Sequence, residues 1–257
     1  MTLCPAQSTV VHPDGIVCFG GEDWWYHNRG HFDMQIMRRL AKRMPVLYVN
    51  SIGMRRPRLG EGRTTLARVR RKLRSYSRGF ARIDDGFAVL SPITVPGMRA
   101  WSKPIAQRQI SGAMASLGMR HPLAWVACPT AVDLLDSLPF RDLVYQRTDR
   151  YECFDGVDAR EISGCDQMLK RDAAITVYCA RTLLDGDASG CRRTAWIDHG
   201  VDFERFAGAA RDARVPEDLA AIPGPRVGFI GGIDSHTFDA PLFRDVAQRM
   251  PHVSFAL

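Results

Sequence analysis

The sequence lacks the uncharged apolar run of about 18 or more residues that a membrane-spanning helix needs. Its N-terminus also lacks the charged region followed by an apolar stretch that marks a secretory signal peptide. Hydrophobic residues make up 46% and charged residues 25% of the 257 positions, which excludes a disordered, collagen-like or coiled-coil chain. We therefore expect a globular, cytoplasmic protein with one large domain or two modest ones.

Cofactor and metal motifs are missing as well. The chain has seven cysteines, an odd number, and no two have the CxxC spacing, so neither a disulfide framework nor a structural zinc site is indicated. No G-x-G-x-x-G follows any strand-like run, which argues against dinucleotide binding. We accordingly expect no bound metal and no cofactor.

Positive charge is concentrated in one segment. The formal net charge is +7, and eleven of the basic residues lie in residues 54–82, where Glu61 is the only acidic residue. Three interpretations remain open: a solvated loop and helix, a patch for an anionic membrane surface, or nucleic-acid binding, which is disfavoured because no recognised motif accompanies the charge. In the membrane interpretation the apolar stripe Leu66, Val69 and Leu73 dips into the interface.

Apolar runs of strand length alternate with helical periodicity along most of the chain, which predicts an α/β fold with a doubly wound, mostly parallel Rossmann-like sheet. The helix over 103–117 tolerates Pro104 in its first turn, and Thr130 is the expected N-cap of the helix that follows it. The predicted strands cover residues 16–19, 46–49, 80–83, 87–90, 123–127, 143–146, 173–178 and 194–197. The predicted helices cover about 30–43, 65–76, 103–117, 130–138 and 159–171.

The composition changes after residue 206. Residues 207–225 are rich in Ala, Asp, Pro and Gly and indicate a short helix and a linker, whereas residues 226–257 start a second β-α-β pattern. The predicted domains are thus 1–206, a linker 207–225, and an incomplete second domain 226–257. Because one β-α-β unit cannot cover both faces of its own sheet, we expect the chain to be the front of a longer two-domain protein.

Four motifs in this order resemble a known family. They are Trp-Val-Ala-Cys-Pro at 125–129, Val-Tyr-Gln-Arg-Thr-Asp at 144–149, the stretch 197–206 with its His-Gly-Val-Asp-x-x-x-Phe element, and Arg-Val-Gly-Phe-Ile-Gly-Gly at 226–232. The chain resembles GT-B-fold glycosyltransferases, and most of all the bacterial teichuronic-acid-type enzymes of surface polysaccharide synthesis. The element at 199–206 is the most specific of the four.

The resemblance implies an activity and its substrates. A first Rossmann-like domain would hold a saccharide or lipid-linked acceptor, and a second would hold a nucleotide-sugar donor, without a metal. On this view the protein is cytoplasmic or peripheral on the inner face of the plasma membrane, and it does not bind nucleic acid. Most of the donor site would follow residue 257, so we expect this chain alone to be inactive. The alternative is a non-catalytic acceptor-binding or interaction remnant.

The first candidate substrate contacts lie at the end of the first strand. Gly20 and Gly21 would let backbone amides approach a phosphate or sugar, although a plain tight turn explains them equally well. The following loop, residues 22–29, is rich in aromatic residues, so Trp24 would stack on a sugar ring and Arg29 would bind an anionic acceptor. The alternative is that one tryptophan packs onto the core.

Further candidates follow later strands. Arg147 and Asp149 follow the strand 143–146, and Asp149 is the best candidate for orienting or deprotonating the acceptor hydroxyl, with a salt bridge or N-cap role as the alternative. His199 and Gly200 should lie at the mouth of the cleft, where the chain approaches the linker, with Phe203 and Phe206 anchoring the next turn in the core. Gly231 and Gly232 resemble the glycine turn under the donor diphosphate. Each of these sites also has a purely structural explanation.

Overall fold

The computed structural model describes residues 12–26, 30–54, 70–94, 99–212, 214–233 and 238–257. Arg29, Leu66, Val69 and the basic residues of 55–69 lie outside these ranges. Contacts divide the chain into two compact units, Met1–Gly200 and Val201–Leu257. The division falls six residues before the predicted domain boundary at 206, and each unit is described by itself.

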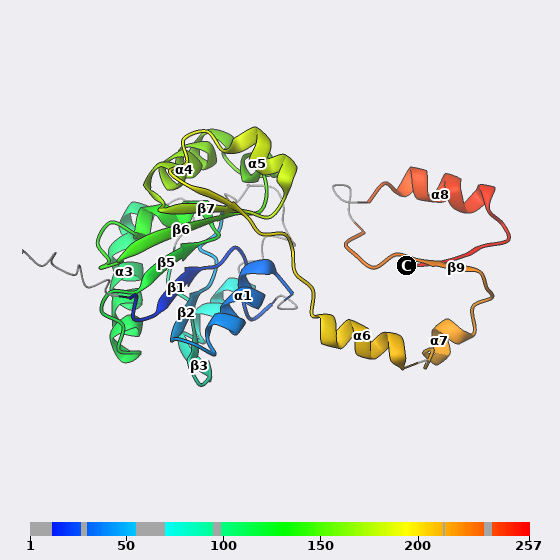
Figure 1. Cartoon of the computed structure of the whole chain (residues 1–257), viewed down its shortest axis with the longest axis horizontal. Helices are drawn as coiled ribbons and strands as arrows, with labels where there is room; N and C mark the ends of the chain where they lie inside the picture. The colour runs from blue at the N-terminus through cyan, green and yellow to red at the C-terminus, as the bar shows by residue number, and fades with distance from the viewer. Residues whose placement is uncertain (1–11, 27–29, 55–69, 95–98, 213, 234–237) are drawn as a thin grey trace, which may run out of the picture. The chain divides into compact units, whose positions relative to one another are not determined.

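The first unit is built on one eight-stranded sheet (Figure 1). Its strand order is β3-β4-β2-β1-β5-β6-β7-β8, and every neighbouring pair is parallel except the β3–β4 hairpin. The predicted mostly parallel Rossmann-like sheet is thereby confirmed. The strands are β1 Ile16–Phe19, β2 Val46–Val49, β3 Phe80–Asp84, β4 Phe87–Leu90, β5 Leu123–Val126, β6 Asp142–Arg147, β7 Ile175–Tyr178 and β8 Thr194–Trp196.

The sheet has a hydrophobic core on each face, because successive side chains of a strand point to opposite sides. Val17 and Phe19 of β1 pack in one cluster with α3 and α4, whereas Ile16 and Cys18 pack in the other with α1. The helices are α1 Phe32–Leu40, α3 Arg99–Ser116, α4 Ala159–Asp172 and α5 Arg181–Asp187, with the 3₁₀ turns η1 Pro129–Leu134 and η2 Tyr151–Cys153. Residues 70–76 are also helical.

Several predicted boundaries and caps are wrong. Helix α3 begins at Arg99, so Pro104 lies inside the helix and not in its first turn. The segment after β5 is a 3₁₀ turn with Cys128 as its N-cap, and the Thr130 hydroxyl donates to the Gly53 carbonyl 3.2 Å away instead of capping a helix. Helix α5 was not predicted at all, because its short polar sequence shows little periodicity.

The second unit contains one parallel β-α-β unit. Its elements are α6 Phe203–Arg211, α7 Glu217–Ala220, β9 Arg226–Gly228, α8 Ala240–Arg249 and β10 Ser254–Ala256. Within the described part of 201–257 no residue is buried. Phe203 and Phe206, which were predicted to anchor in a core, find none within the described part of this unit, where their exposed fractions are 67% and 64%. No helix in the described ranges has the length and apolar character to cross a membrane.

Candidate functional site at the carboxyl edge of the sheet

The chain reverses its winding direction between β1 and β5, which are neighbours in the sheet. The segment after β1 leads to α1, whose Met34 and Met37 pack on one face. The segment after β5 leads to η1, whose Ala131 and Leu134 pack on the other. Open α/β sheets bind ligands at the carboxyl ends of the strands at such a switch point, so this edge is the candidate site.

Gly20 is required by packing. A Cβ built on Gly20 would lie 2.0 Å from the Tyr48 hydroxyl oxygen, and that hydroxyl donates to Asp33 Oδ2 at 2.9 Å. The amide of Gly21 donates to the same carboxylate oxygen, also at 2.9 Å. Burial, and then the negative charge of Asp33, raise the pKa of the Tyr48 hydroxyl well above its usual range. The Gly20-Gly21 turn is thus held by protein groups, as its tight-turn interpretation required.

The two tryptophans of the loop after β1, Trp24 and Trp25, contact other protein side chains. Trp24 is 2% exposed and its ring lies 4.8 Å from that of Phe87, so the predicted stacking of Trp24 on a sugar is corrected to a core role. Its amide donates to Asn50 Oδ1 at 2.9 Å. The Trp25 indole donates to Ser91 Oγ at 3.1 Å, while the guanidinium of Arg78 lies 4.4 Å from the ring centroid. The alternative of a tryptophan on the core therefore fits the structure.

Loops from both sides of β1 meet in what we call the switch-point cluster, formed by Ser51, Gly53, Lys72, Cys128 and Thr130. Ser51 Oγ lies 4.0 Å from Cys128 Sγ, and that sulfur lies 3.3 Å from the Thr130 hydroxyl. The ammonium of Lys72 donates to the Ser51 carbonyl at 2.6 Å. These contacts join the segment after β2 to the segment after β5 across the end of β1.

In the sequence, Lys72 stands out only as one charge of the basic segment. Of the predicted apolar stripe only Leu73 lies in the described residues, and it is 61% exposed. The inward face of the helix carries Lys72, Ser75 and Tyr76, and Ser75 is completely buried. Their i, i+3, i+4 spacing was the signal for this polar inner face.

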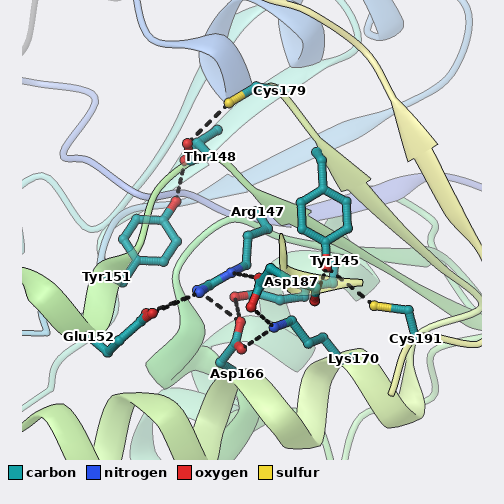
Figure 2. Close-up of polar contacts among 11 residues, drawn as sticks. Tyr145, Arg147, Thr148, Tyr151, Glu152, Asp166, Lys170, Cys179, Asp187 and Cys191 are labelled. Atoms are coloured by element: carbon teal, nitrogen blue, oxygen red, sulfur yellow. Dashed lines mark hydrogen bonds and ion pairs between the residues drawn. The ribbon is translucent and has the colours of Figure 1, made fainter. Parts of the chain in front are cut away.

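Arg147 faces away from the switch point. It lies in register opposite Tyr178 in β7, and like Tyr145 it points to the α4 face of the sheet. The side chain is 1% exposed and pairs with three carboxylates, Asp187 at 2.6 Å, Asp166 at 2.9 Å and Glu152 at 3.1 Å (Figure 2). The predicted substrate contact of Arg147 is corrected, since a buried guanidinium with three partners holds the fold together.

Lys170 completes this ion network. Its ammonium lies 2.7 Å from both Asp166 and Asp187, so two carboxylates are shared between two cations. Arg147 Nη1 reaches Asp166 Oδ1 as an ion pair without hydrogen-bond geometry. Burial alone would lower the pKa of the Arg147 guanidinium, but Tyr145, Asp166 and Asp187 raise it above its usual value. The arginine stays charged in the folded protein.

Asp149 lies at the carboxyl edge of the sheet, just after β6. It lies two residues beyond the end of β6 and its side chain is exposed. The neighbouring Thr148 and Tyr151 hydroxyls hydrogen-bond to each other. Burial raises the pKa of the Tyr151 hydroxyl, and the nearby groups Asp149, Asp33 and Cys128 raise that pKa further. Residues following β1, β5 and β6 are therefore gathered at one edge.

The His199 ring also reaches this edge. It is exposed, follows β8, and lies edge-on to Phe32 of α1 with ring centroids 5.4 Å apart. Gly200 is exposed beside it. In the second unit, Gly231 and Gly232 are exposed after β9, and a Cβ on Gly231 would lie 2.9 Å from the Phe229 ring. Among the described residues no group of three or more His, Cys, Asp or Glu side chains is arranged to hold a metal ion.

Comparison with known proteins shows a fold and not a family. No protein-family model and no curated protein matches the sequence. A solved structure of sucrose-phosphate synthase from Thermosynechococcus elongatus is similar with a TM-score of 0.53 and 13% identity, covering 94% of this chain and 70% of that one. Another structure of that protein gives 0.43 and 11%, covering 78% and 96%. The first match supports the α/β, Rossmann-like architecture.

Proposed function

We propose that this protein is glycosyltransferase-like and transfers a sugar from a nucleotide-sugar donor to a saccharide or lipid-linked acceptor. The observation that carries the proposal is the architecture, a doubly wound sheet followed by a second β-α-β start. Its similarity to sucrose-phosphate synthase, a GT-B glycosyltransferase, extends over 94% of this chain. The four motifs at 125–129, 144–149, 197–206 and 226–232 support the same activity, and three of them lie at strand ends of this architecture.

We propose Asp149 as the group that orients or deprotonates the acceptor hydroxyl. Its support is position, since it is exposed at the edge where the segments after β1, β5 and β6 meet. A carboxylate can carry out this role by accepting the hydroxyl proton. His199 and Gly200 are proposed as acceptor contacts at the same edge, and Gly231 and Gly232 as donor contacts in the second unit.

The proposed biological context is surface polysaccharide synthesis at an anionic membrane surface. In the described part of the basic segment, Arg70, Arg71 and Arg74 are exposed, and Leu73 is exposed beside them. A basic helix with an exposed apolar side chain suits an anionic lipid surface. We further propose that residues 1–257 alone transfer no sugar, because the described second unit buries no residue of its own and forms only one β-α-β unit.

The test is a panel of nucleotide sugars and acceptors assayed by release of nucleoside diphosphate. The panel is run with residues 1–257 and with the protein as isolated from its own cells. Transfer by the protein from its cells and none by residues 1–257 is the expected result. Release by neither protein, together with acceptor binding, would instead identify a non-catalytic acceptor-binding domain.

Asp149→Asn tests the catalytic assignment in the active protein. We expect a loss of about 100-fold or more in the transfer rate, the range seen when a general base is removed. The matched control is Asp142→Asn, because Asp142 is also exposed but lies at the opposite, amino end of the same strand. Equal rates for the two variants would remove Asp149 from the mechanism.

A further inference from the structure

Lysine is rare in this chain. Of the 35 basic side chains only four are lysines, namely Lys42, Lys72, Lys103 and Lys170. Lys103 pairs with Asp136, and Lys170 pairs with Asp166 and Asp187. Lys42 is exposed in the turn after α1. Lys72 differs from all three, because it is half-buried in the switch-point cluster and no carboxylate of the described residues lies within ion-pair distance.

The position of the Lys72 ammonium is set by two contacts. It donates to the Ser51 carbonyl at 2.6 Å and lies 5.2 Å from the centroid of the Tyr76 ring. The Tyr76 hydroxyl is itself hydrogen-bonded to the Thr94 carbonyl, which fixes the ring under the lysine. An ammonium has three N–H donors, and a single protein carbonyl takes one of them.

Burial and nearby groups act in opposite directions on the pKa of the Lys72 ammonium. Burial lowers the pKa of the ammonium, and the nearby charges of Asp23 and Cys128 oppose this effect while that of Arg71 adds to it. The guanidinium of Arg71 is engaged over the Tyr26 ring, 5.8 Å from its centroid. Exposed Arg70 and Arg74 on the same helix add positive potential near the site.

We propose that the Lys72 ammonium binds a phosphate group of a substrate at the switch point of the sheet. A lysine binds phosphate as a point charge, and a partly desolvated ammonium with free donors gains more from an anion than an exposed one does. The phosphate would be carried by the acceptor or by a nucleotide. This inference names the substrate chemistry of the proposed site and, in that respect, rests on the proposed function.

Calorimetric titration of residues 1–257 with inorganic phosphate at physiological salt tests the binding directly. Lys72→Met removes the charge and keeps the aliphatic stem, and we expect it to weaken binding by about tenfold or more. The control is Arg74→Met, which removes an exposed cation from the same helix and should change binding less than about twofold. Equal phosphate affinity in Lys72→Met and the wild type would overturn the proposal and leave Lys72 as an anchor for the Ser51 carbonyl.

A second measurement follows the Lys72 ammonium itself. Lysine labelled with ¹⁵N at Nζ gives only four side-chain signals in this chain, so the Lys72 signal can be assigned by its loss in Lys72→Arg. Saturating phosphate should raise the pKa of the Lys72 signal and leave that of Lys42 unchanged, since a bound anion favours the charged form. An unchanged Lys72 pKa in saturating phosphate would refute the assignment.

The source of the phosphate and the proposed function are tested separately. Tighter binding of a short-chain prenyl phosphate than of inorganic phosphate would assign the site to a lipid-linked acceptor, and tighter binding of a nucleoside diphosphate would assign it to the donor. Both outcomes support the proposal and are lost in Lys72→Met. Phosphate binding at Lys72 together with no sugar transfer by the protein from its own cells would contradict the proposed function alone, and sugar transfer by that protein without Lys72-dependent binding would contradict this inference alone.

Discussion

Replacing Arg147 with methionine should severely destabilise the first unit. The substitution keeps an unbranched side chain of similar length in the same buried place and removes the charge. It leaves Asp166, Asp187 and Glu152 with Lys170 as the only remaining cation of the network, and Lys170 contacts only the first two. Asp166 is the most sensitive of these carboxylates because its side chain is only 7% exposed.

The expected loss in the free energy of unfolding follows from how deeply each charged partner is buried. Removing one partner of a buried ion pair costs about 3–5 kcal/mol, because a charge stays in the interior without compensation. Glu152→Gln removes a partner that is 26% exposed, so its expected cost is below about 1 kcal/mol. Arg147→Lys should fall between the two, since an ammonium keeps the charge but cannot contact three carboxylates with one planar group.

Urea unfolding followed by tryptophan fluorescence measures these differences in the free energy of unfolding. A second variant, Arg147→Met combined with Asp166→Asn, should recover part of the loss because it removes one uncompensated charge. If Arg147→Met and Glu152→Gln cost the same, or if the double variant is less stable than Arg147→Met, then the network does not act as described and Arg147 regains its candidacy as a ligand contact.

Three further predictions follow from single contacts. Gly20→Ala should cost about 1–3 kcal/mol in unfolding free energy because its Cβ meets Tyr48. Gly21→Ala should cost less than about 1 kcal/mol, because its Cβ would lie 3.8 Å from the nearest atom, the Ala127 carbonyl oxygen. Equal costs for the two variants would contradict the packing argument. Burial alone would raise the pKa of Asp187, but hydrogen bonds and charges from Lys170 and Arg147 lower that pKa below its usual 3.8. The Asp187 carboxylate therefore contributes its full stabilisation above about pH 5, and this stabilisation is lost as pH falls through the lowered pKa. Asp187→Asn should therefore flatten the stability profile between pH 5 and 3, and an unchanged slope would refute this. A thiol reagent should label exposed Cys153 in the native protein and Cys18 only on unfolding, since Cys18 is buried and burial raises its pKa; loss of one fast equivalent in Cys153→Ser checks the assignment.

Most of the fold could be predicted from the sequence because its strands are short apolar runs. Buried parallel strands such as Val46–Val49 have side chains in both cores, so they are apolar throughout and easy to recognise. Helix α5 and the 3₁₀ turn η1 were missed or misassigned because short elements carry little periodicity. Pro104 was placed in a first turn because the predicted helix began at 103, four residues after the observed start at Arg99.

The candidate site was harder to predict because a side chain at a strand end can point to the edge or into a layer. Trp24 and Arg147 are residue types that often bind sugars and anions, but here they serve the cores on opposite sides of the sheet. Lys72 was overlooked for the opposite reason, since it is one charge among eleven in 54–82 and only the polar inner face of its helix distinguishes it.

Sheet register explains which predicted contacts reach the edge. Arg147 is paired in register with Tyr178, so the alternation of the strand commits its side chain to one face. Asp149 lies two residues past that pairing, and Cys128 lies two residues past the last pair of β5, Val126 with Tyr145. Residues beyond the paired register are released from the alternation and can turn toward the edge. The residues one to three positions past a parallel strand are therefore not bound to one face of the sheet, and Asp149 belongs to that set while Arg147 does not.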